Sequence, residues 1–215
     1  VEAFLRRIRF PYTVGYGMTE CGPLISYAAW DVQRPASCGK VVDRMEIRVD
    51  SSDPASVAGV LWVRGQNVMK GYYKNDEATA SVFDADGWMN TGDICNVDSD
   101  GYIYIRGRDK NMILGPSGQN IYPEEIEHLL NNMPYVNESL VVEKDGKLVA
   151  LVHPDIEAAS AVGLKMPQIE QQMEKNISDL NHDLPDYSRI AEVKVFQEEF
   201  EKTPKRSIKR YLYQH

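Results

Sequence analysis

The sequence predicts an α+β fold in which a small β-barrel-like subdomain precedes a compact α+β C-terminal domain. Two observations support this prediction. Before residue 108, short segments rich in β-branched and aromatic residues are separated by Gly and Asp, a pattern typical of strands and turns. After residue 110, segments whose apolar residues follow helical spacing occur together with strand-like segments. The change near Arg108–Lys110 predicts two domains, 1–108 and 109–215.

Three segments of the first domain have the composition of strands: residues 39–50, 58–73 and 100–108. In the last of them, tyrosine and arginine alternate with isoleucine from Tyr102 to Arg106, the period of two that is typical of a strand. Several short strands at this spacing are typical of a small barrel or a sandwich.

The second domain begins with a predicted amphipathic helix over residues 122–133. Pro123 occupies the helix start, acidic residues fill the first turn, and apolar residues follow at helical spacing. The next elements are a hairpin, a second amphipathic helix and a last strand, over residues 139–154, 166–184 and 192–197. Asp145-Gly146 supplies the two-residue turn of the hairpin.

The composition is that of a soluble globular protein. The chain has 215 residues, of which 43% are hydrophobic and 26% charged. Its net charge of −8 includes five basic residues between positions 202 and 210, so the rest of the chain is more acidic still. Such a surface repels phosphate backbones, and we expect no nucleic-acid partner.

The cysteines and apolar segments indicate a cytoplasmic protein. Cys21, Cys38 and Cys95 are odd in number, widely separated and without a C-x-x-C pair, which favours neither a disulfide framework nor a zinc site. No apolar run approaches the roughly 20 residues that cross a bilayer. We therefore expect no transmembrane segment, and residues 1–17 lack the long apolar block of a signal peptide.

The first motif that carries chemistry is "YGMTECGP", residues 16–23. Gly17 allows close backbone approach, Thr19 offers a hydroxyl, and the Glu20 carboxylate suits a hard cation such as Mg²⁺. A turn capped by Thr19 and Glu20 is the structural alternative, because short motifs often occur by chance.

The second motif spans residues 87–110 and contains Thr-Gly-Asp. The Asp93 carboxylate can accept hydrogen bonds from both hydroxyls of a ribose, and Arg108 adds a fork of donors for the same sugar or a phosphate. Asp98 and Asp100 instead indicate an ordinary turn between two strands. A structural turn is the alternative for Asp93 alone, and its coupling to Arg108 favours the sugar site.

The third motif, residues 115–127, is a glycine-containing loop that leads into a helix N-terminus. Such a loop can accept an anion or let a thin substrate pass the backbone. A flexible connector explains the same residues equally well.

Together, in this order, these stretches resemble the adenylate-forming (AMP-binding) superfamily of acyl-CoA synthetases, luciferases and peptide-synthetase adenylation domains. The matching stretches are "YGMTE", "GVLWVRGQNVMKGYY", "DGWMNTGD", "DGYIYIRGRDKNMI" and "SGQNIYPEEIE". The resemblance extends from about Tyr16 to the C-terminus. "GQNIYPEEIE" and "VALVHPD" most resemble the long-chain fatty-acyl branch.

The resemblance implies a long-chain fatty-acid–CoA ligase. Such an enzyme uses ATP and Mg²⁺ to convert a fatty acid to an acyl-adenylate, releases pyrophosphate, and passes the acyl group to coenzyme A. The implied partners are these small molecules. The implied nucleotide-site residues are Tyr16 and Gly17 beside adenine and the acyl group, Thr19 at the phosphate, Glu20 at Mg²⁺, and Asp93 and Arg108 at the ribose.

The resemblance also implies residues that act between the two half-reactions. Asp109, followed by Lys110, occupies the hinge about which a small C-terminal domain rotates, a known way to separate two chemistries at one site. Gly118 would line the tunnel for the pantetheine arm of coenzyme A.

Two family features are not found in the sequence: the Ser/Thr/Gly-rich phosphate loop ending in Lys-Gly, and most of the acyl pocket. We expect both to lie upstream of Val1, in the missing part of a larger N-terminal domain. Residues 1–108 would then be the last, β-rich subdomain of that domain, and 109–215 the mobile C-terminal domain. The 215-residue chain is expected to fold but not to complete adenylation.

The basic segment near the C-terminus departs from the family pattern. The family ends in a motif whose lysine bridges the acid and the phosphate, and Ser207 stands at that position. Lys205 and Lys209 lie two residues to either side, on the same face of an extended segment. Lys209 is favoured as the replacement because it keeps the family's end pattern. The alternative is a solvated basic tail.

Two other functions stay open. A ligase for an aryl or short-chain acid would share every motif. A non-catalytic binding module would explain Ser207 as lost activity, with the basic tail contacting a partner or a membrane surface.

Overall fold

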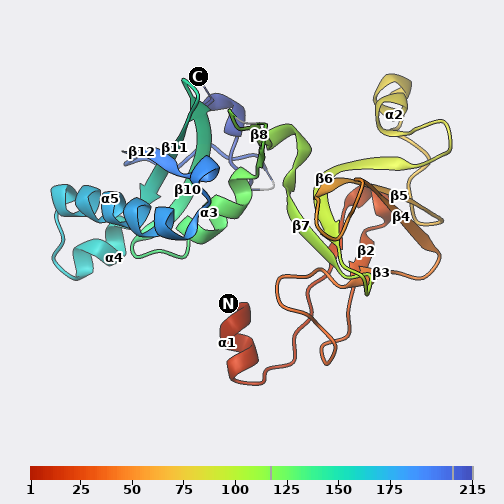
Figure 1. Ribbon diagram of the computed structural model, residues 1–215, viewed down its shortest axis with the longest axis horizontal. Helices are drawn as coiled ribbons and strands as arrows, with labels where there is room; N and C mark the ends of the chain where they lie inside the picture. The colour runs from red at the N-terminus through yellow and green to blue at the C-terminus, as the bar shows by residue number, and fades with distance from the viewer. Residues whose placement is uncertain (117, 205, 215) are drawn as a thin grey trace. The chain divides into compact units, whose positions relative to one another are not determined.

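The computed structural model describes residues 1–116, 118–204 and 206–214. The chain divides into two compact units, Val1–Lys110 and Asn111–His215. Both units combine helices with β-sheet (Figure 1), which confirms the α+β class.

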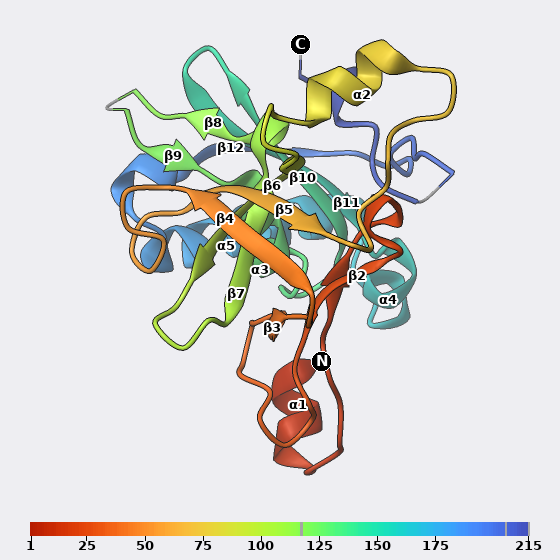
Figure 2. The same ribbon diagram turned by 90° about the vertical axis from the view of Figure 1, so that its right-hand side faces the viewer.

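The first unit contains two sheets. Four strands form an antiparallel sheet in sequence order: β4 (Met45–Asp50), β5 (Gly59–Gly65), β6 (Met89–Val97) and β7 (Ile103–Arg108). Figure 2 shows this meander from orange to green. The second sheet has the order β1 (Tyr16–Gly17), β2 (Leu24–Tyr27) and β3 (Lys40–Val41).

The strands do not close into a barrel. Among the described residues, β4 pairs as a strand only with β5 and β7 only with β6, so the four strands form no closed ring. On the outer side of β7, the Ile103 backbone hydrogen-bonds to Cys38 and Gly39, just before β3. The two sheets share one core instead. Ile25 of β2, and Cys21 of the 3₁₀ turn before it, pack in the same buried cluster as Leu61 and Val63 of β5 and Met89 of β6. This arrangement corresponds to the sandwich alternative rather than to a barrel.

The short helices of this unit have only weak signals in the sequence. They are α1 (Glu2–Arg7), α2 (Asp76–Val82) and the 3₁₀ turns η1 (Thr19–Cys21) and η2 (Asp109–Asn111). Asn75 caps α2, because its side-chain oxygen accepts a hydrogen bond from the Ala78 N–H at 3.0 Å. Neither α1 nor α2 buries a residue, so the sequence carries no apolar stripe to predict them.

The second unit is built on the sheet β10 (Val136–Lys144), β11 (Lys147–Pro154) and β12 (Ile190–Val195). β10 and β11 form the predicted hairpin, in which Asp145 and Gly146 both have positive φ. β12 adds in parallel to β11. The smaller elements are β8 (Ile113–Leu114), β9 (Asn120–Ile121), α4 (Ile156–Ala161), η3 (Asp186–Ser188) and η4 (Arg210–Leu212).

Both faces of this sheet are covered. The helices α3 (Pro123–Leu130) and α5 (Met166–Asp183) confirm the two predicted amphipathic helices, and they pack against the face that carries Val141, Ala150 and Val152. Figure 1 shows α5 lying across the strands. The opposite face carries Leu140, Val142, Val149 and Leu151, which pack against Phe200, Ile208 and Tyr213. The C-terminal segment is therefore part of the folded core of this unit.

Candidate active site

The structure brings three of the sequence-predicted residues into one cluster. Asp93 on β6 and Arg108 on β7 are direct cross-strand partners, and Arg108 Nε lies 2.9 Å from Asp93 Oδ1. Tyr16 of β1 reaches the same carboxylate from the other sheet, and its hydroxyl donates a hydrogen bond to Asp93 Oδ2 at 2.5 Å. The pairing of β6 with β7 and the approach of Tyr16 from the other sheet thus assemble a carboxylate, a guanidinium and a phenol, with Tyr16 and Asp93 77 residues apart in sequence.

Thr91 fixes the backbone around this cluster. Its buried hydroxyl donates to the Leu61 carbonyl at 2.8 Å and accepts from the Asp93 N–H at 3.1 Å. Its carbonyl accepts a hydrogen bond from Arg108 Nη1 at 3.3 Å. Immediately after Asp93 the register of β6 with β7 shifts, between Ile94 and Cys95. Irregularities of this kind re-aim side chains and are common beside functional sites.

The cluster joins a buried carboxylate to a guanidinium at the surface. The Asp93 side chain is 7% exposed, whereas the Arg108 side chain is 50% exposed. Burial raises the pKa of the Tyr16 phenol well above its ordinary value, and the negative charge of Asp93 raises it further. Tyr16 therefore remains protonated and serves as a hydrogen-bond donor, while Arg108 offers its guanidinium to solvent.

The motif at residues 16–23 forms a well-ordered turn. Thr19 and Glu20 lie in η1, directly after β1, with Thr19 exposed and Glu20 half-buried. A Cβ atom at Gly17 would collide with the Pro23 carbonyl oxygen, so this position requires glycine. A turn is present, but no side-chain hydrogen bond caps η1, so Thr19 and Glu20 are not the caps that the structural alternative required.

Two residues after β5, neither of them a predicted site residue, support this turn. Asn67 donates hydrogen bonds to the carbonyls of Cys21 and Leu24, at 2.7 and 3.0 Å. The Tyr72 hydroxyl donates to Glu20 Oε1 at 3.1 Å. Both residues belong to "GQNVMKGYY", a stretch that carried the family resemblance, so a signal for them was present in the sequence.

Glu20 is not part of a cage of metal-binding side chains among the residues described. In the described part of the chain, no group of three or more His, Cys, Asp or Glu residues is arranged to hold a metal ion. Mg²⁺ in nucleotide sites is usually held by one or two carboxylates together with substrate phosphates. The one carboxylate of Glu20 fits that mode of binding.

Two of the three cysteines lie in the core and are poorly suited to act as nucleophiles. All are free thiols, and Cys21 and Cys95 are buried. Burial raises the pKa of Cys21 to about 11 and that of Cys95 to about 12, where the reactive thiolate is scarce at neutral pH.

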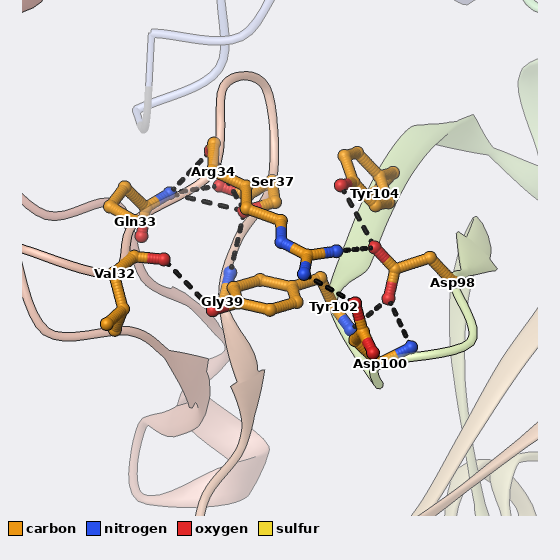
Figure 3. A network of polar contacts seen from close by, with 9 residues as sticks. All are labelled: Val32, Gln33, Arg34, Ser37, Gly39, Asp98, Asp100, Tyr102 and Tyr104. Atoms are coloured by element: carbon orange, nitrogen blue, oxygen red, sulfur yellow. Dashed lines mark hydrogen bonds and ion pairs between the residues drawn. The ribbon is translucent and has the colours of Figure 1, made fainter.

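A second polar network fixes the far end of the β6–β7 hairpin (Figure 3). Arg34 Nη1 lies 2.7 Å from Asp98 Oδ2, Arg34 Nη2 lies 2.5 Å from Asp100 Oδ2, and the guanidinium stacks over the Tyr102 ring at 4.1 Å. The other oxygen of Asp98 accepts the N–H groups of Asp100 and Tyr102. Asp98 and Asp100 are thus turn residues, as predicted, and Arg34 holds the turn of the hairpin that carries Asp93 and Arg108.

Three other sequence-predicted residues lie at exposed turns. Asp109 and Lys110 are in η2, where the chain leaves the first unit. Gly118 lies between β8 and β9 with φ +81°, and nothing lies within 4 Å of the place where a Cβ would be. Its N–H donates to the Gly115 carbonyl at 2.9 Å, and the Gly115 N–H donates to the Gln119 carbonyl at 2.8 Å. This loop is therefore a hydrogen-bonded turn, and its left-handed position favours glycine.

The basic C-terminal segment is a structured loop, not a solvated tail. Lys202 and Ile208 form a β-bridge, and the Lys209 N–H donates to the Glu201 carbonyl at 2.8 Å. We call residues 201–209 the C-terminal hairpin. Ser207 is exposed within it, and Lys205 lies outside the described residues.

Three of the cations in this region are held by acids. Lys202 Nζ lies 2.7 Å from Glu138 and 3.1 Å from Glu199, and Lys209 Nζ lies 3.0 Å from Glu201. The Arg210 Nη2 atom lies 2.8 Å from both carboxylate oxygens of Glu127, and both side chains are 12% exposed. Arg210 Nη1 also donates to the Val141 carbonyl at 2.8 Å. Arg210 therefore fastens the end of the hairpin to α3 and β10.

In the described ranges, no helix combines the length and apolar character that a membrane span requires.

Two family models match the chain. One, described as AMP-binding enzyme, matches residues 1–73. The other, described as AMP-binding enzyme C-terminal domain, matches residues 110–214.

Curated proteins and a solved structure are similar to the chain. It is 42% identical over 133 residues to a long-chain-fatty-acid–CoA ligase of Yersinia pestis, covering 60% of this chain and 23% of the relative. It is 40% identical over 147 residues to an indoleacetate–CoA ligase of Aromatoleum aromaticum, covering 64% of this chain and 28% of the relative. The chain thus spans about a quarter of the length of these relatives.

Among solved structures, O-succinylbenzoate coenzyme A synthetase of Bacillus subtilis, in complex with ATP and a magnesium ion, matches with a TM-score of 0.79. The two are 25% identical, and the match covers 96% of this chain and 42% of that one.

Proposed function

The chain belongs to the AMP-binding enzyme family, and from this we propose that it is the C-terminal part of an ATP-dependent acyl-CoA ligase. In the first half-reaction a carboxylate oxygen of the acid attacks the α-phosphorus of ATP, and pyrophosphate leaves. In the second, the thiol of coenzyme A attacks the carbonyl carbon of the acyl-adenylate, and AMP leaves. The observation that carries the proposal is the cluster of Tyr16, Asp93 and Arg108.

The cluster is suited to hold the sugar and phosphate of a nucleotide. Asp93 is fixed by two partners, so its carboxylate keeps one orientation when a ribose binds. Arg108 is anchored at Nε and exposed at the surface, where its remaining N–H groups suit a ribose hydroxyl or a phosphate oxygen. Preorganised donors of this kind need no rearrangement during the reaction.

The remaining roles are carried over by position. Tyr16 and Gly17 would line the adenine and acyl side, Thr19 would contact the phosphate, and Glu20 would hold Mg²⁺ together with the ATP phosphates. Mg²⁺ would neutralise charge on those phosphates. Asp109 and Lys110 would form the hinge between the domains 1–108 and 109–215. Gly118 would allow the pantetheine arm of coenzyme A to pass.

We propose a long-chain fatty acid as the acid substrate, and an aryl acid is the second candidate. The Yersinia pestis relative supports the first, with 42% identity over 133 residues. The Aromatoleum aromaticum relative supports the second, with 40% identity over 147 residues. The acyl pocket of such an enzyme lies upstream of these residues in the family pattern, so the choice has to be made by experiment.

The test is ATP–pyrophosphate exchange by the longer enzyme that contains this chain, with fatty acids and aryl acids offered separately. Asp93→Asn should reduce exchange by about 10- to 100-fold, because a charged hydrogen-bond acceptor contributes roughly 1.5–3 kcal/mol. Asp86→Asn is the matched control, since Asp86 is exposed and lies outside the proposed site. Exchange that requires an aryl acid would select the second candidate.

A non-catalytic binding module would give a different result. The complete protein would then show no exchange with any acid and no affinity for an adenylate analogue. The 215-residue chain alone should also lack exchange, because the phosphate loop is not in its sequence. Exchange by that chain alone would contradict the proposed division of the active site.

A further inference from the structure

Among its described residues, the C-terminal hairpin carries one cation, Arg206, in its turn. The Thr203 N–H donates to the Ser207 carbonyl at 2.8 Å, and the Arg206 N–H donates to the Thr203 carbonyl at 2.8 Å. These bonds close a tight turn in which Arg206 has φ +62°. This left-handed region is one that glycine adopts without strain.

The base of the hairpin is rigidly held. Ile208 and Tyr213 pack with Phe200 against the sheet, and the Phe200 and Tyr213 rings meet edge to face with centroids 5.2 Å apart. The Tyr213 hydroxyl accepts the Glu201 N–H at 2.8 Å. The buried pair of Arg210 with Glu127 fastens the end of the second arm. Both arms of the hairpin are therefore anchored to the core of the second unit.

The other described cations of the segment already have partners. Lys202 binds Glu138 and Glu199, Lys209 binds Glu201, and Arg210 binds Glu127. Arg206 is exposed, and its guanidinium makes no ion pair or hydrogen bond with the residues described. It affects Glu199 only at a distance: the pKa of Glu199 is held below its ordinary value mainly by the hydrogen bond from Lys202.

Other members of the family have a lysine at the position of Ser207. The contacts described above favour a different replacement for that lysine than the sequence did. Lys209, the favoured candidate from sequence, would have to leave Glu201 to reach a substrate. Ser207 has no charge. Arg206 is adjacent to Ser207, and its planar guanidinium can bind two phosphate oxygens at once.

We propose that Arg206 is the catalytic cation that this chain supplies to adenylate formation, binding the negative charge shared by the acid carboxylate and the α-phosphate. The proposal rests on the proposed function. In this step the carboxylate oxygen forms a bond to phosphorus, the bond to pyrophosphate breaks, and the electron pair leaves with pyrophosphate. Arg206 keeps its protons throughout and acts by charge alone.

The experiment compares two half-reactions in the longer enzyme. Adenylation is measured by ATP–pyrophosphate exchange, and thioester formation by adding coenzyme A to preformed acyl-adenylate. Arg206→Gly removes the side chain while glycine accepts a φ near +62° without strain. We expect a loss of about 10²- to 10³-fold in exchange, as when a donor to a developing anion is removed, with thioester formation unchanged. Arg206→Lys should restore part of the exchange.

Three comparison variants make the outcome decisive. Arg189→Gly removes an exposed arginine elsewhere in the second unit and should leave both half-reactions unchanged. Lys209→Ala should reduce exchange by less than about threefold. If the wild-type enzyme is active and the Arg206→Gly variant shows full exchange, the role of Arg206 is overturned but the proposed function is not. Loss of exchange in Lys209→Ala or Lys205→Ala, with Arg206→Gly active, would assign the role to that lysine.

Two further outcomes also count against the proposal. An equal loss of both half-reactions in Arg206→Gly, with a lowered midpoint of thermal unfolding, would show a structural role. Absence of exchange by the wild-type enzyme with every acid would overturn the proposed function, and the role of Arg206 with it.

Discussion

Asp93 and Arg108 face each other across β6 and β7, with 2.9 Å between Asp93 Oδ1 and Arg108 Nε. The carboxylate is almost buried and the guanidinium is half-exposed, so the pair spans the boundary between the core and the surface. Tyr16 binds the other carboxylate oxygen. Each member of this cluster can be removed separately, and each removal has a different expected result.

Arg108→Ala should weaken nucleotide binding more than it weakens the fold. The side chain is half-exposed, so the loss of its ion pair should cost only about 1 kcal/mol of unfolding free energy. The affinity of the longer enzyme for AMP should fall by at least about tenfold, and calorimetric titration measures it. Arg108→Lys keeps the charge but not the fork of donors. It should therefore restore the unfolding free energy more fully than the affinity for AMP. If Arg108→Ala lowered stability and AMP affinity by equal free energies, the proposed role of Arg108 at the nucleotide would be contradicted.

Tyr16→Phe should destabilise the first unit. The substitution removes one hydrogen-bond donor from a nearly buried carboxylate, which typically costs about 1–3 kcal/mol. Urea unfolding of the 215-residue chain measures the change. Tyr73→Phe is the matched control, because Tyr73 is 88% exposed. A Tyr16→Phe protein as stable as this control would show that the hydrogen bond to Asp93 contributes nothing.

The Arg210–Glu127 pair should behave as a buried ion pair in a double-mutant cycle. Burial raises the pKa of Glu127 and Arg210 opposes that rise, so either residue alone in the interior is unfavourable. Arg210→Ala and Glu127→Ala should each cost about 3–5 kcal/mol, and the double variant should cost clearly less than their sum. Additive losses in urea unfolding would show that the two side chains do not stabilise one another.

Asp98 should make the first unit less stable in acid. Burial would raise the pKa of Asp98, but hydrogen bonds from the N–H groups of Tyr102 and Asp100, and from Arg34, outweigh it and hold the pKa below its ordinary value. A lowered folded-state pKa adds stability above about pH 4, which is lost as the pH falls through the folded-state value.

Asp98→Asn tests this dependence. The variant should unfold at a lower temperature than the wild type at pH 7, and the difference should shrink as the pH falls below about 4. Thermal unfolding followed by circular dichroism between pH 2.5 and pH 7 measures it. A difference that stays constant over this range would mean that the charge of Asp98 is not involved.

Helices and turns could be predicted from the sequence where a short run of neighbouring residues carries the whole pattern. The stripe on α5 recurs every three or four residues, and Ile169, Met173, Ile177 and Leu180 are all buried as that spacing requires. The Asp145-Gly146 turn follows from two residues that tolerate positive φ. By contrast, α1 and α2 bury no side chain, so their sequences show no apolar periodicity from which to predict them.

The α+β class, the motifs and the identity of the candidate site residues follow from local spacing and residue type, so they could be predicted without a structure. Which side chains meet depends on the fold. The hydrogen bond of Tyr16 to Asp93 joins residues 77 apart, and the pair of Arg210 with Glu127 joins residues 83 apart. Five basic residues near the C-terminus look equivalent in sequence, yet of the four that the structure describes, Lys202, Lys209 and Arg210 pair with acids while Arg206 lies in an exposed turn. Charge pairing is set by positions in space, and these depend on how distant segments pack.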